Sequence, residues 1–236
     1  MNSEQELFLE THNKTGYIAT RLDPFTKEFI NYAGNCDKAV MEIGAGFGFA
    51  SEGALKAGAY VICNDLEASH LDVLKNKYKG NRDLNILPGN ILTDIELEAN
   101  SLEAILVSRV IHFFSPSEVN QFIAKIEKWL CKGGRIYAVV ETPYLKNWQK
   151  FIPTFHSRVT EGCEWPGFIA DPAEYETAGR AVSLPKFVHW FDEKTIRKPF
   201  EAHGFKVLRC ENFSRTGMLA LLRKIIVSFR KVIFLC

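Results

Sequence analysis

A carboxylate and three glycines lie close together in the segment 39–48, which reads Ala-Val-Met-Glu-Ile-Gly-Ala-Gly-Phe-Gly. Glu42 stands two residues before Gly44, the first of three glycines that alternate with Ala45 and Phe47. Glycine adopts positive φ and lets backbone amides approach a ligand with no Cβ between them. The apolar run before the glycines predicts a buried strand, and the residues after them predict a helix N-terminus. A strand, a glycine turn and a helix in this order are typical of a nucleotide-binding site.

The charge of Glu42 narrows the class of ligand. At the carboxyl end of the first strand it is expected to face the ligand crevice. There it would repel a pyrophosphate and attract a ligand that carries an ammonium and a sulfonium group. Phe49 occupies the place where the dinucleotide fingerprint G-x-G-x-x-G has its third glycine. The pattern therefore favours a cationic adenosine derivative over a nicotinamide dinucleotide, whose oxidoreductases are the first alternative class.

The run Glu-Ile-Gly-Ala-Gly-Phe-Gly at 42–48 resembles the first motif of class I methyltransferases that use S-adenosylmethionine. The resemblance extends, in the family's order, over about residues 38–143. It implies an α/β fold with a doubly wound, mostly parallel seven-stranded Rossmann-like sheet, N-terminal helices and an insertion after the fifth strand. It also implies S-adenosyl-L-methionine as the cofactor, with its amino acid moiety held by Glu42 and the turn at Gly44, Ala45 and Gly46.

The second predicted strand, 60–64, ends at Asp65. Asp65 follows Gly44 at roughly the spacing of about 20 residues expected for the ribose-binding acid of such folds. Its two oxygens can accept hydrogen bonds from both ribose hydroxyls. The alternative is that Asp65 only caps the helix that follows. If Asp65 holds the ribose, Leu66 is expected to lie against the adenine.

The third predicted strand, 84–87, leads to Asn90 and Ile91. In the methyltransferase family this place commonly holds a polar residue that bonds the adenine amino group and an apolar neighbour on the ring. The resemblance therefore implies adenine contacts for Asn90 and Ile91. An ordinary turn asparagine is the alternative.

The fourth predicted strand, 102–107, runs into Ser108 and His112. Ligands of open α/β sheets bind outside the carboxyl ends of the strands, so Ser108 is expected to contact the cofactor at the border of the methyl-transfer site. His112 is the candidate general base, because imidazole titrates near neutral pH. A histidine packed beside the core is the alternative.

Residues 4–34 are predicted to be helical, because their apolar residues recur at intervals compatible with one helix face. In the family, an aromatic or polar residue from such a lead-in often reaches over the cofactor. Tyr17 and Arg21 are the candidates for that contact. The alternative is that both residues only pack or face solvent.

A helix is predicted to begin at 116, and the fifth strand, 135–140, is predicted after the Lys-Gly-Gly turn at 132–134. The regular alternation of strands and helices stops after this strand. The segment 144–185 is rich in aromatic residues and prolines, and we interpret it as a substrate cap whose aromatics also form a small secondary core. A strand at 186–191, a helix at 192–202 and a sixth strand at 206–209 are predicted next. The apolar and basic tail, 216–236, is expected to supply an antiparallel seventh strand. A basic amphipathic helix that contacts a membrane or a partner is the alternative.

Composition limits the possible number of domains, the kinds of ligand and the cellular location. With 236 residues, of which 47% are hydrophobic, the chain is expected to form a single domain over 1–236. A formal net charge of +1 gives no field that attracts nucleic acid. The six cysteines form no C-x-x-C pair, the N-terminus lacks the features of a signal peptide, and no zinc signature is present. These features predict reduced cysteines, a cytoplasmic location and no metal site.

The predicted function is in-line transfer of a methyl group from S-adenosyl-L-methionine to a small-molecule acceptor. The sulfonium is an activated leaving group, so positioning can supply most of the rate. Two further alternatives stay open: a non-catalytic binding module that keeps the fold, and a protein or nucleic-acid methyltransferase.

Overall fold

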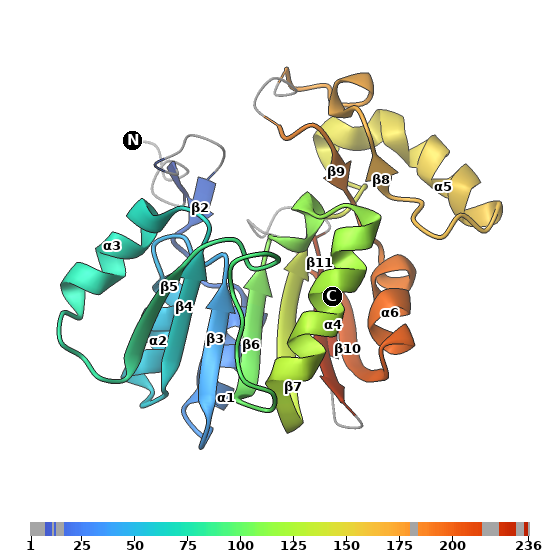
Figure 1. The fold of residues 1–236 in the computed structure, drawn as a ribbon. Coiled ribbons are helices and arrows are strands. Elements are labelled where there is room, and N and C mark those ends of the chain that lie inside the picture. Colours follow the sequence, from blue (N-terminus) through green and yellow to red (C-terminus); the bar gives the residue numbers. More distant parts are fainter. Residues whose placement is uncertain are drawn as a thin grey trace.

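The computed structural model describes residues 8–10, 12, 17–179, 184–213, 222–229 and 234–235. Their centre is an eight-stranded sheet with the strand order β10-β11-β12-β7-β6-β3-β4-β5 (Figure 1). Neighbouring strands in the series β7-β6-β3-β4-β5 pair in parallel. These five strands are β3 (Ala39–Ile43), β4 (Val61–Asp65), β5 (Leu84–Pro88), β6 (Leu102–Ser108) and β7 (Leu130–Val140). The predicted α/β class with a mostly parallel sheet is confirmed.

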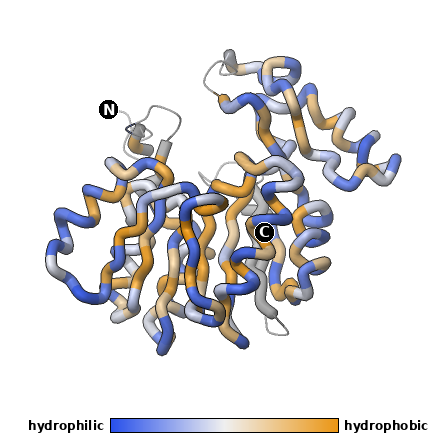
Figure 2. The backbone as a smooth tube through the Cα atoms, viewed as in Figure 1, coloured by the Kyte–Doolittle hydropathy of each residue, from blue (hydrophilic) through white to orange (hydrophobic). Residues whose placement is uncertain are grey.

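Helices cover both faces of the sheet. In Figure 1, α4 (Pro116–Trp129) crosses in front of the strands, whereas α1 (Pro24–Ala33) and α2 (Phe49–Lys56) lie behind them. Two further helices complete the layers, α3 (Ala68–Lys77) and α6 (Glu193–Ala202). Figure 2 shows apolar residues concentrated along the central strands. Burial of both faces of these strands excludes water from the sheet, as expected for parallel strands between two helical layers.

The strand order places a topological switch point between β3 and β6. From β3 the chain proceeds outward through β4 and β5, then returns to β6 on the other side of β3. The loops that leave β3 and β6 therefore diverge at their carboxyl ends and leave a crevice between them. The fold thus positions a ligand site where Glu42, Asp65 and Ser108 were expected to meet.

The N-terminal lead-in differs from the helical prediction. Residues 24–33 form α1, but β1 (Phe8–Glu10) and β2 (Tyr17–Ala19) pair as antiparallel strands, with Leu9 opposite Ile18. The helical prediction is wrong for these strands. Aromatic and β-branched residues favour extended backbone, and the intervening sequence contains Gly16, a poor helix former.

The carboxyl half shows two further differences, and it confirms the antiparallel strand expected from the tail. β7 begins at Leu130, so the Lys-Gly-Gly sequence at 132–134 lies within a strand and not in a turn before it. The tail contributes β11 (Leu222–Phe229), which pairs antiparallel with both β10 (Phe205–Phe213) and β7. The alternative of an amphipathic helix is therefore wrong for β11. The sheet has eight strands and not seven because β12 (Phe234–Leu235) adds a short pairing. The rest of the tail lies outside the described residues, and its contact with a membrane or partner stays a prediction.

The segment after β7 forms a separate lobe, seen in Figure 1 with α5 (Ile152–Thr160), β8 (Phe168–Ile169) and β9 (Val188–His189). Two 3₁₀ helices, η3 (Lys146–Phe151) and η4 (Pro172–Glu174), complete it. The strand predicted at 186–191 is reduced to β9, which pairs with β8 outside the main sheet. The expected secondary core is present, and its buried members are Trp148, Phe151, Phe155, Ile169, Val188 and Trp190. Among the described helices, none combines the length and apolar character needed to cross a bilayer.

Candidate cofactor and acceptor site

A cavity of about 770 Å³ opens at the carboxyl ends of β3, β4 and β6. Most of the residues predicted for the cofactor line it, and His112 lines it too. The side chain of Tyr17, the remaining candidate, lies outside the described part of the structure. The predicted residues on the cavity wall are Arg21, Glu42, Gly44, Ala45, Gly46, Asp65, Leu66, Asn90, Ile91, Ser108 and His112.

The turn between β3 and α2 requires glycine for two reasons. Gly44, Gly46 and Gly48 have φ values of 68°, 55° and 74°, a region that other residues rarely adopt. A Cβ on Gly44 would lie 2.2 Å from Cγ2 of Val110, and one on Gly46 would lie 2.5 Å from Cδ1 of Ile18. The turn is therefore packed from both sides, and its backbone forms a surface of the cavity.

Glu42 lines the cavity, and its carboxyl group also accepts hydrogen bonds from the first turn of α2. It is only 7% exposed. Its Oε2 accepts hydrogen bonds from the backbone N–H of Ser51 at 2.7 Å and from the Ser51 hydroxyl at 2.6 Å. Burial raises the pKa of the Glu42 carboxyl to about 7; the Ser51 bonds oppose that rise, and the neighbouring charge of Asp65 adds to it. The site therefore holds a carboxyl group whose charge is poised near neutral pH.

The raised pKa of Glu42 predicts a pH-dependent affinity for a cationic ligand. If the ionised carboxylate attracts the ammonium group of S-adenosylhomocysteine, the affinity should rise about tenfold between about pH 6 and pH 8, as the carboxyl ionises. Glu42 also makes the stability of the ligand-free protein depend on pH. Between pH 4.5, the ordinary pKa of the group, and about pH 7, the free energy of unfolding falls as pH rises, because Glu42 ionises at lower pH in the unfolded chain than in the folded protein. Calorimetric titration across this pH range measures the affinity.

Two variants control this experiment. Glu42→Gln should flatten the pH profile, and Ser51→Ala should move its midpoint to higher pH, because one bond to the ionised carboxylate is lost. A wild-type profile already flat between these pH values would show that the charge of Glu42 does not contact the ligand.

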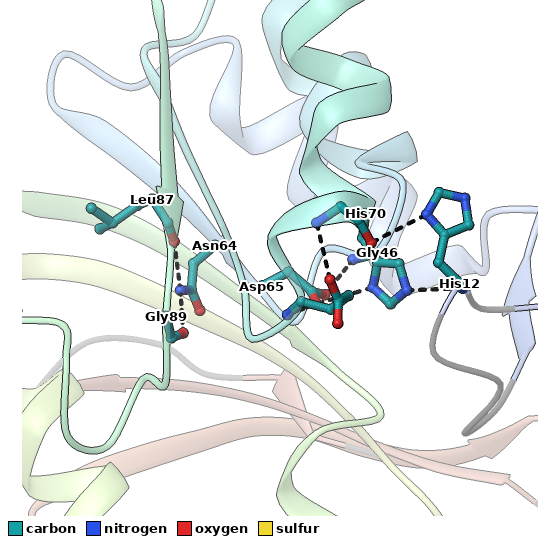
Figure 3. Close-up of polar contacts among 9 residues, drawn as sticks. His12, Gly46, Asn64, Asp65, His70, Leu87 and Gly89 are labelled. Atoms are coloured by element: carbon teal, nitrogen blue, oxygen red, sulfur yellow. Dashed lines mark hydrogen bonds and ion pairs between the residues drawn. The ribbon is translucent and has the colours of Figure 1, made fainter.

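Asp65 is the centre of a polar network at the end of β4 (Figure 3). Its Oδ2 accepts the N–H of Gly46 at 2.7 Å, and its Oδ1 accepts the N–H of Glu67 at 2.9 Å and lies 3.1 Å from Nδ1 of His70. The N-cap of α3 is Glu67 and not Asp65, so the capping alternative is not what the structure shows. A carboxylate has roughly four lone-pair positions. With these three bonds in place, Asp65 has room for about one more, and its ribose role stays a prediction.

The part of the cavity that is expected to hold the adenine contains a turn as well as apolar side chains. Oδ1 of Asn90 accepts the N–H of Leu92 at 2.9 Å, so Asn90 fulfils the turn role that was its alternative. Leu66 is 72% exposed and Ile91 is buried, and both line the cavity. Asn64, which the sequence analysis missed, donates to the carbonyls at the end of β5 and just beyond it, at 2.8 and 3.0 Å (Figure 3). The adenine contact of Asn90 stays a prediction.

An ion pair at the ends of β6 and β7 was also missed. Nε of Arg109 lies 3.3 Å from Oε1 of Glu141, and both side chains line the cavity. Glu141 is only 8% exposed, and Arg109 has a φ of 60°, which is uncommon outside glycine. Strained backbone of this kind often accompanies functional sites. The sequence does contain a signal for Glu141, because an acidic residue at the end of a predicted core strand is also what singled out Asp65.

His112 has features of both of its interpretations. It lies in the short 3₁₀ helix η2 (Ile111–Phe113) and is buried, with its ring centroid 4.1 Å from that of Phe113 and 5.7 Å from that of Trp190. It is therefore packed against aromatic rings, one of them from the lobe after β7. Because it also lines the cavity, the imidazole remains a candidate base.

Comparison with known sequences agrees with the motifs. Residues 41–138 match the family model described as "Methyltransferase domain". A phosphoethanolamine N-methyltransferase 1 from Triticum aestivum is 32% identical over 120 residues, which cover 45% of this chain and 21% of that protein. A second enzyme of the same name, from Zea mays, is 27% identical over 108 residues, or 42% of this chain and 20% of that protein. The chain thus spans about a fifth of the length of these relatives.

Solved structures share the fold. A methyltransferase from Burkholderia thailandensis, crystallised with 1,6-didemethyltoxoflavin and S-adenosylhomocysteine, superposes with a TM-score of 0.61 at 14% identity, over 86% of this chain and 77% of that one. A methyltransferase from Methanosarcina mazei gives a TM-score of 0.62 at 18% identity, over 88% and 98% of the two chains. The motif, the matched domain and the shared fold agree. Residues 41–138 thus match a methyltransferase domain, and the chain has the fold of S-adenosylmethionine-dependent methyltransferases of known structure.

Proposed function

We propose that this protein binds S-adenosyl-L-methionine in the cavity and transfers its methyl group to a small-molecule acceptor. The observation that carries the proposal is the convergence of Glu42, the glycine turn and Asp65 on one cavity. A carboxylate on each side of a glycine-rich turn suits a ligand with an ammonium group and ribose hydroxyls. When bound, the cofactor supplies a methyl group activated by the positive charge of sulfur.

The residues that line the cavity fall into two groups, one for the cofactor and one for the acceptor. Glu42 and the glycine turn would hold the amino acid moiety of the cofactor, Asp65 its ribose, and Asn90, Leu66 and Ile91 its adenine. Ser108, Arg109, His112 and Glu141 lie at the other strand ends, where the acceptor would bind. There the protein's task is to orient the acceptor and exclude water, since positioning can supply most of the rate.

A small acceptor is supported by the walls of the cavity and by the relatives. Leu184 and Pro185, which follow the lobe's described helices, line the cavity and support the proposed cap role of 144–185. The Triticum aestivum relative is named for phosphoethanolamine, and the Burkholderia thailandensis structure contains 1,6-didemethyltoxoflavin, both small molecules.

Methyl transfer from labelled S-adenosylmethionine tests the proposal. The purified protein is incubated with fractionated cell extract, and labelled product is expected in the small-molecule fraction. Label in the protein or nucleic-acid fraction would contradict the small-molecule acceptor. Binding of S-adenosylhomocysteine without transfer to any fraction would favour the non-catalytic binding module.

His112→Ala separates catalysis from packing. If the imidazole takes a proton from the acceptor, turnover should fall roughly 100-fold while the affinity for S-adenosylhomocysteine stays unchanged. Rate measurement and calorimetric titration check the two quantities. A fall in the unfolding temperature that accounts for the whole loss of activity would assign His112 to packing against Phe113 and Trp190.

A further inference from the structure

His70, in the first turn of α3, lies between Asp65 and His12 (Figure 3). His12 belongs to the N-terminal segment, by which we mean the described residues before α1: 8–10, 12 and 17–23. It is only 4% exposed. Its Nδ1 lies 3.1 Å from Oδ1 of Asp65, and its Nε2 accepts the main-chain N–H of His12 at 3.1 Å. Because Nε2 accepts a hydrogen bond, the neutral imidazole carries its hydrogen on Nδ1, which therefore donates to Asp65. The contact with His12 thus selects the tautomer that serves Asp65.

The same N-terminal segment covers the glycine turn. The ring of His12 lies 4.9 Å from the ring of Phe47, measured between centroids, and Ile18 packs directly against Gly46. Ile18 and Arg21 also line the cavity. The segment that supports the imidazole of His70 therefore also forms part of the wall against which the cofactor would lie.

We propose that His70 is a positioning residue, which holds the Asp65 carboxylate in its ribose-binding orientation and anchors the N-terminal segment over the glycine turn. This inference rests on the proposed function, because it assigns a role to Asp65 in holding the ribose. His70 also lines the cavity, but the role assigned to it acts through Asp65.

Three hydrogen bonds hold the carboxylate of Asp65 in place before a ligand binds. Gly46, Glu67 and His70 fix the carboxylate of Asp65 from three directions and leave about one lone-pair position for a ligand. Without the Nδ1 donor, the carboxylate can rotate, and ligand binding must then order it at a cost in affinity. Without the Nε2 acceptor, the main-chain N–H of His12 loses its partner, and the N-terminal segment loses one of its attachments.

Three substitutions separate the two tasks. In His70→Asn, the amide nitrogen stands as many bonds from the backbone as Nδ1 does, so the donor to Asp65 is kept and the acceptor for His12 is lost. In His70→Gln, the longer side chain can place its amide oxygen near the position of Nε2, but the donor at Nδ1 is lost. His70→Phe keeps the ring and removes both bonds.

Two measurements report on the two tasks. The first is the affinity for S-adenosylhomocysteine compared with its 2′,3′-dideoxy analogue, which isolates the contribution of the ribose hydroxyls. We expect His70→Phe and His70→Gln to lose roughly tenfold in affinity for S-adenosylhomocysteine and little for the analogue, whereas His70→Asn keeps most of the difference. The second is the rate of hydrogen exchange at the main-chain N–H of His12, which should rise several-fold in His70→Asn and His70→Phe and stay near wild type in His70→Gln.

Asp72→Asn is the matched control, because Asp72 is an exposed residue of the same helix. It should resemble wild type in both measurements. If His70→Phe fails to fold, the opposite patterns of the Asn and Gln variants still decide the question.

Several results would overturn the inference. Equal losses for S-adenosylhomocysteine and the dideoxy analogue would show that His70 does not act through the ribose. A gain in affinity would show that the imidazole only competes with the ligand for Asp65. Wild-type exchange rates at the His12 amide in all three variants would remove the anchoring role. A wild-type protein that does not bind S-adenosylhomocysteine would overturn the proposed function as well, whereas binding that is insensitive to His70 would overturn this inference alone.

Discussion

Asp65→Ala is expected to weaken the binding of S-adenosylhomocysteine by about 2–3 kcal/mol, or roughly 30- to 150-fold. The substitution removes the charge-assisted bond to the ribose. It also leaves the N–H groups of Gly46 and Glu67 and the Nδ1 of His70 without their acceptor. An unpaired buried donor costs free energy, so the glycine turn is expected to lose order together with the ribose contact. Calorimetric titration measures the loss.

Asp65→Asn and Asp83→Ala serve as controls for that experiment. Asn keeps the size of the side chain and one acceptor oxygen, so an intermediate loss is expected. Asp83 is exposed just before β5, and its removal should leave the affinity unchanged. Wild-type affinity in Asp65→Ala would show that the end of β4 does not hold the ribose.

Gly44→Ala is expected to produce the second large effect, on folding as well as on binding. Gly44 has a φ of 68°, and the new Cβ would lie 2.2 Å from Cγ2 of Val110. The backbone conformation costs about 1 kcal/mol and overpacking a further ~1–3 kcal/mol. Because the turn lines the cavity, any shift that relieves the clash should also weaken S-adenosylhomocysteine binding, by at least about tenfold. Denaturant unfolding and titration measure the two losses.

Two comparisons separate the backbone cost from the clash. Gly58 also has a positive φ, 93°, but an added Cβ would meet nothing within 4 Å, so Gly58→Ala should show the backbone cost alone. Adding Val110→Ala to Gly44→Ala removes the clashing methyl group and should restore part of the binding, which a double-mutant cycle quantifies. Equal effects of Gly44→Ala and Gly58→Ala would mean that the close approach of Val110 is unimportant.

The elements that the sequence predicted well are those with local signals. The five parallel strands are short apolar runs bounded by turns, and Glu42 and Asp65 stand at or near the ends of such runs. Their position relative to the ligand crevice follows from the direction of the strands, because carboxyl ends of parallel strands share one edge. The place of such a residue at the ligand crevice can be predicted from its own strand, without knowing which residues surround it in the fold.

The features that were missed depend on pairing between distant segments. The strands Phe8–Glu10 and Tyr17–Ala19 are too short to show a period, and only their mutual pairing distinguishes them from a helix. Arg109 and Glu141 meet because β6 and β7 pair with Ser108 opposite Val139, a register that the sequence does not display. His70 follows Asp65 closely in sequence, but its second bond, to His12, depends on where the N-terminal segment lies.

The most direct test of the account is a calorimetric titration of the purified protein with S-adenosylhomocysteine and, separately, with NAD. We expect one-to-one binding of S-adenosylhomocysteine and no binding of NAD, because a carboxylate beside the glycine turn attracts an ammonium group and repels a pyrophosphate. Binding of NAD without binding of S-adenosylhomocysteine would contradict this expectation.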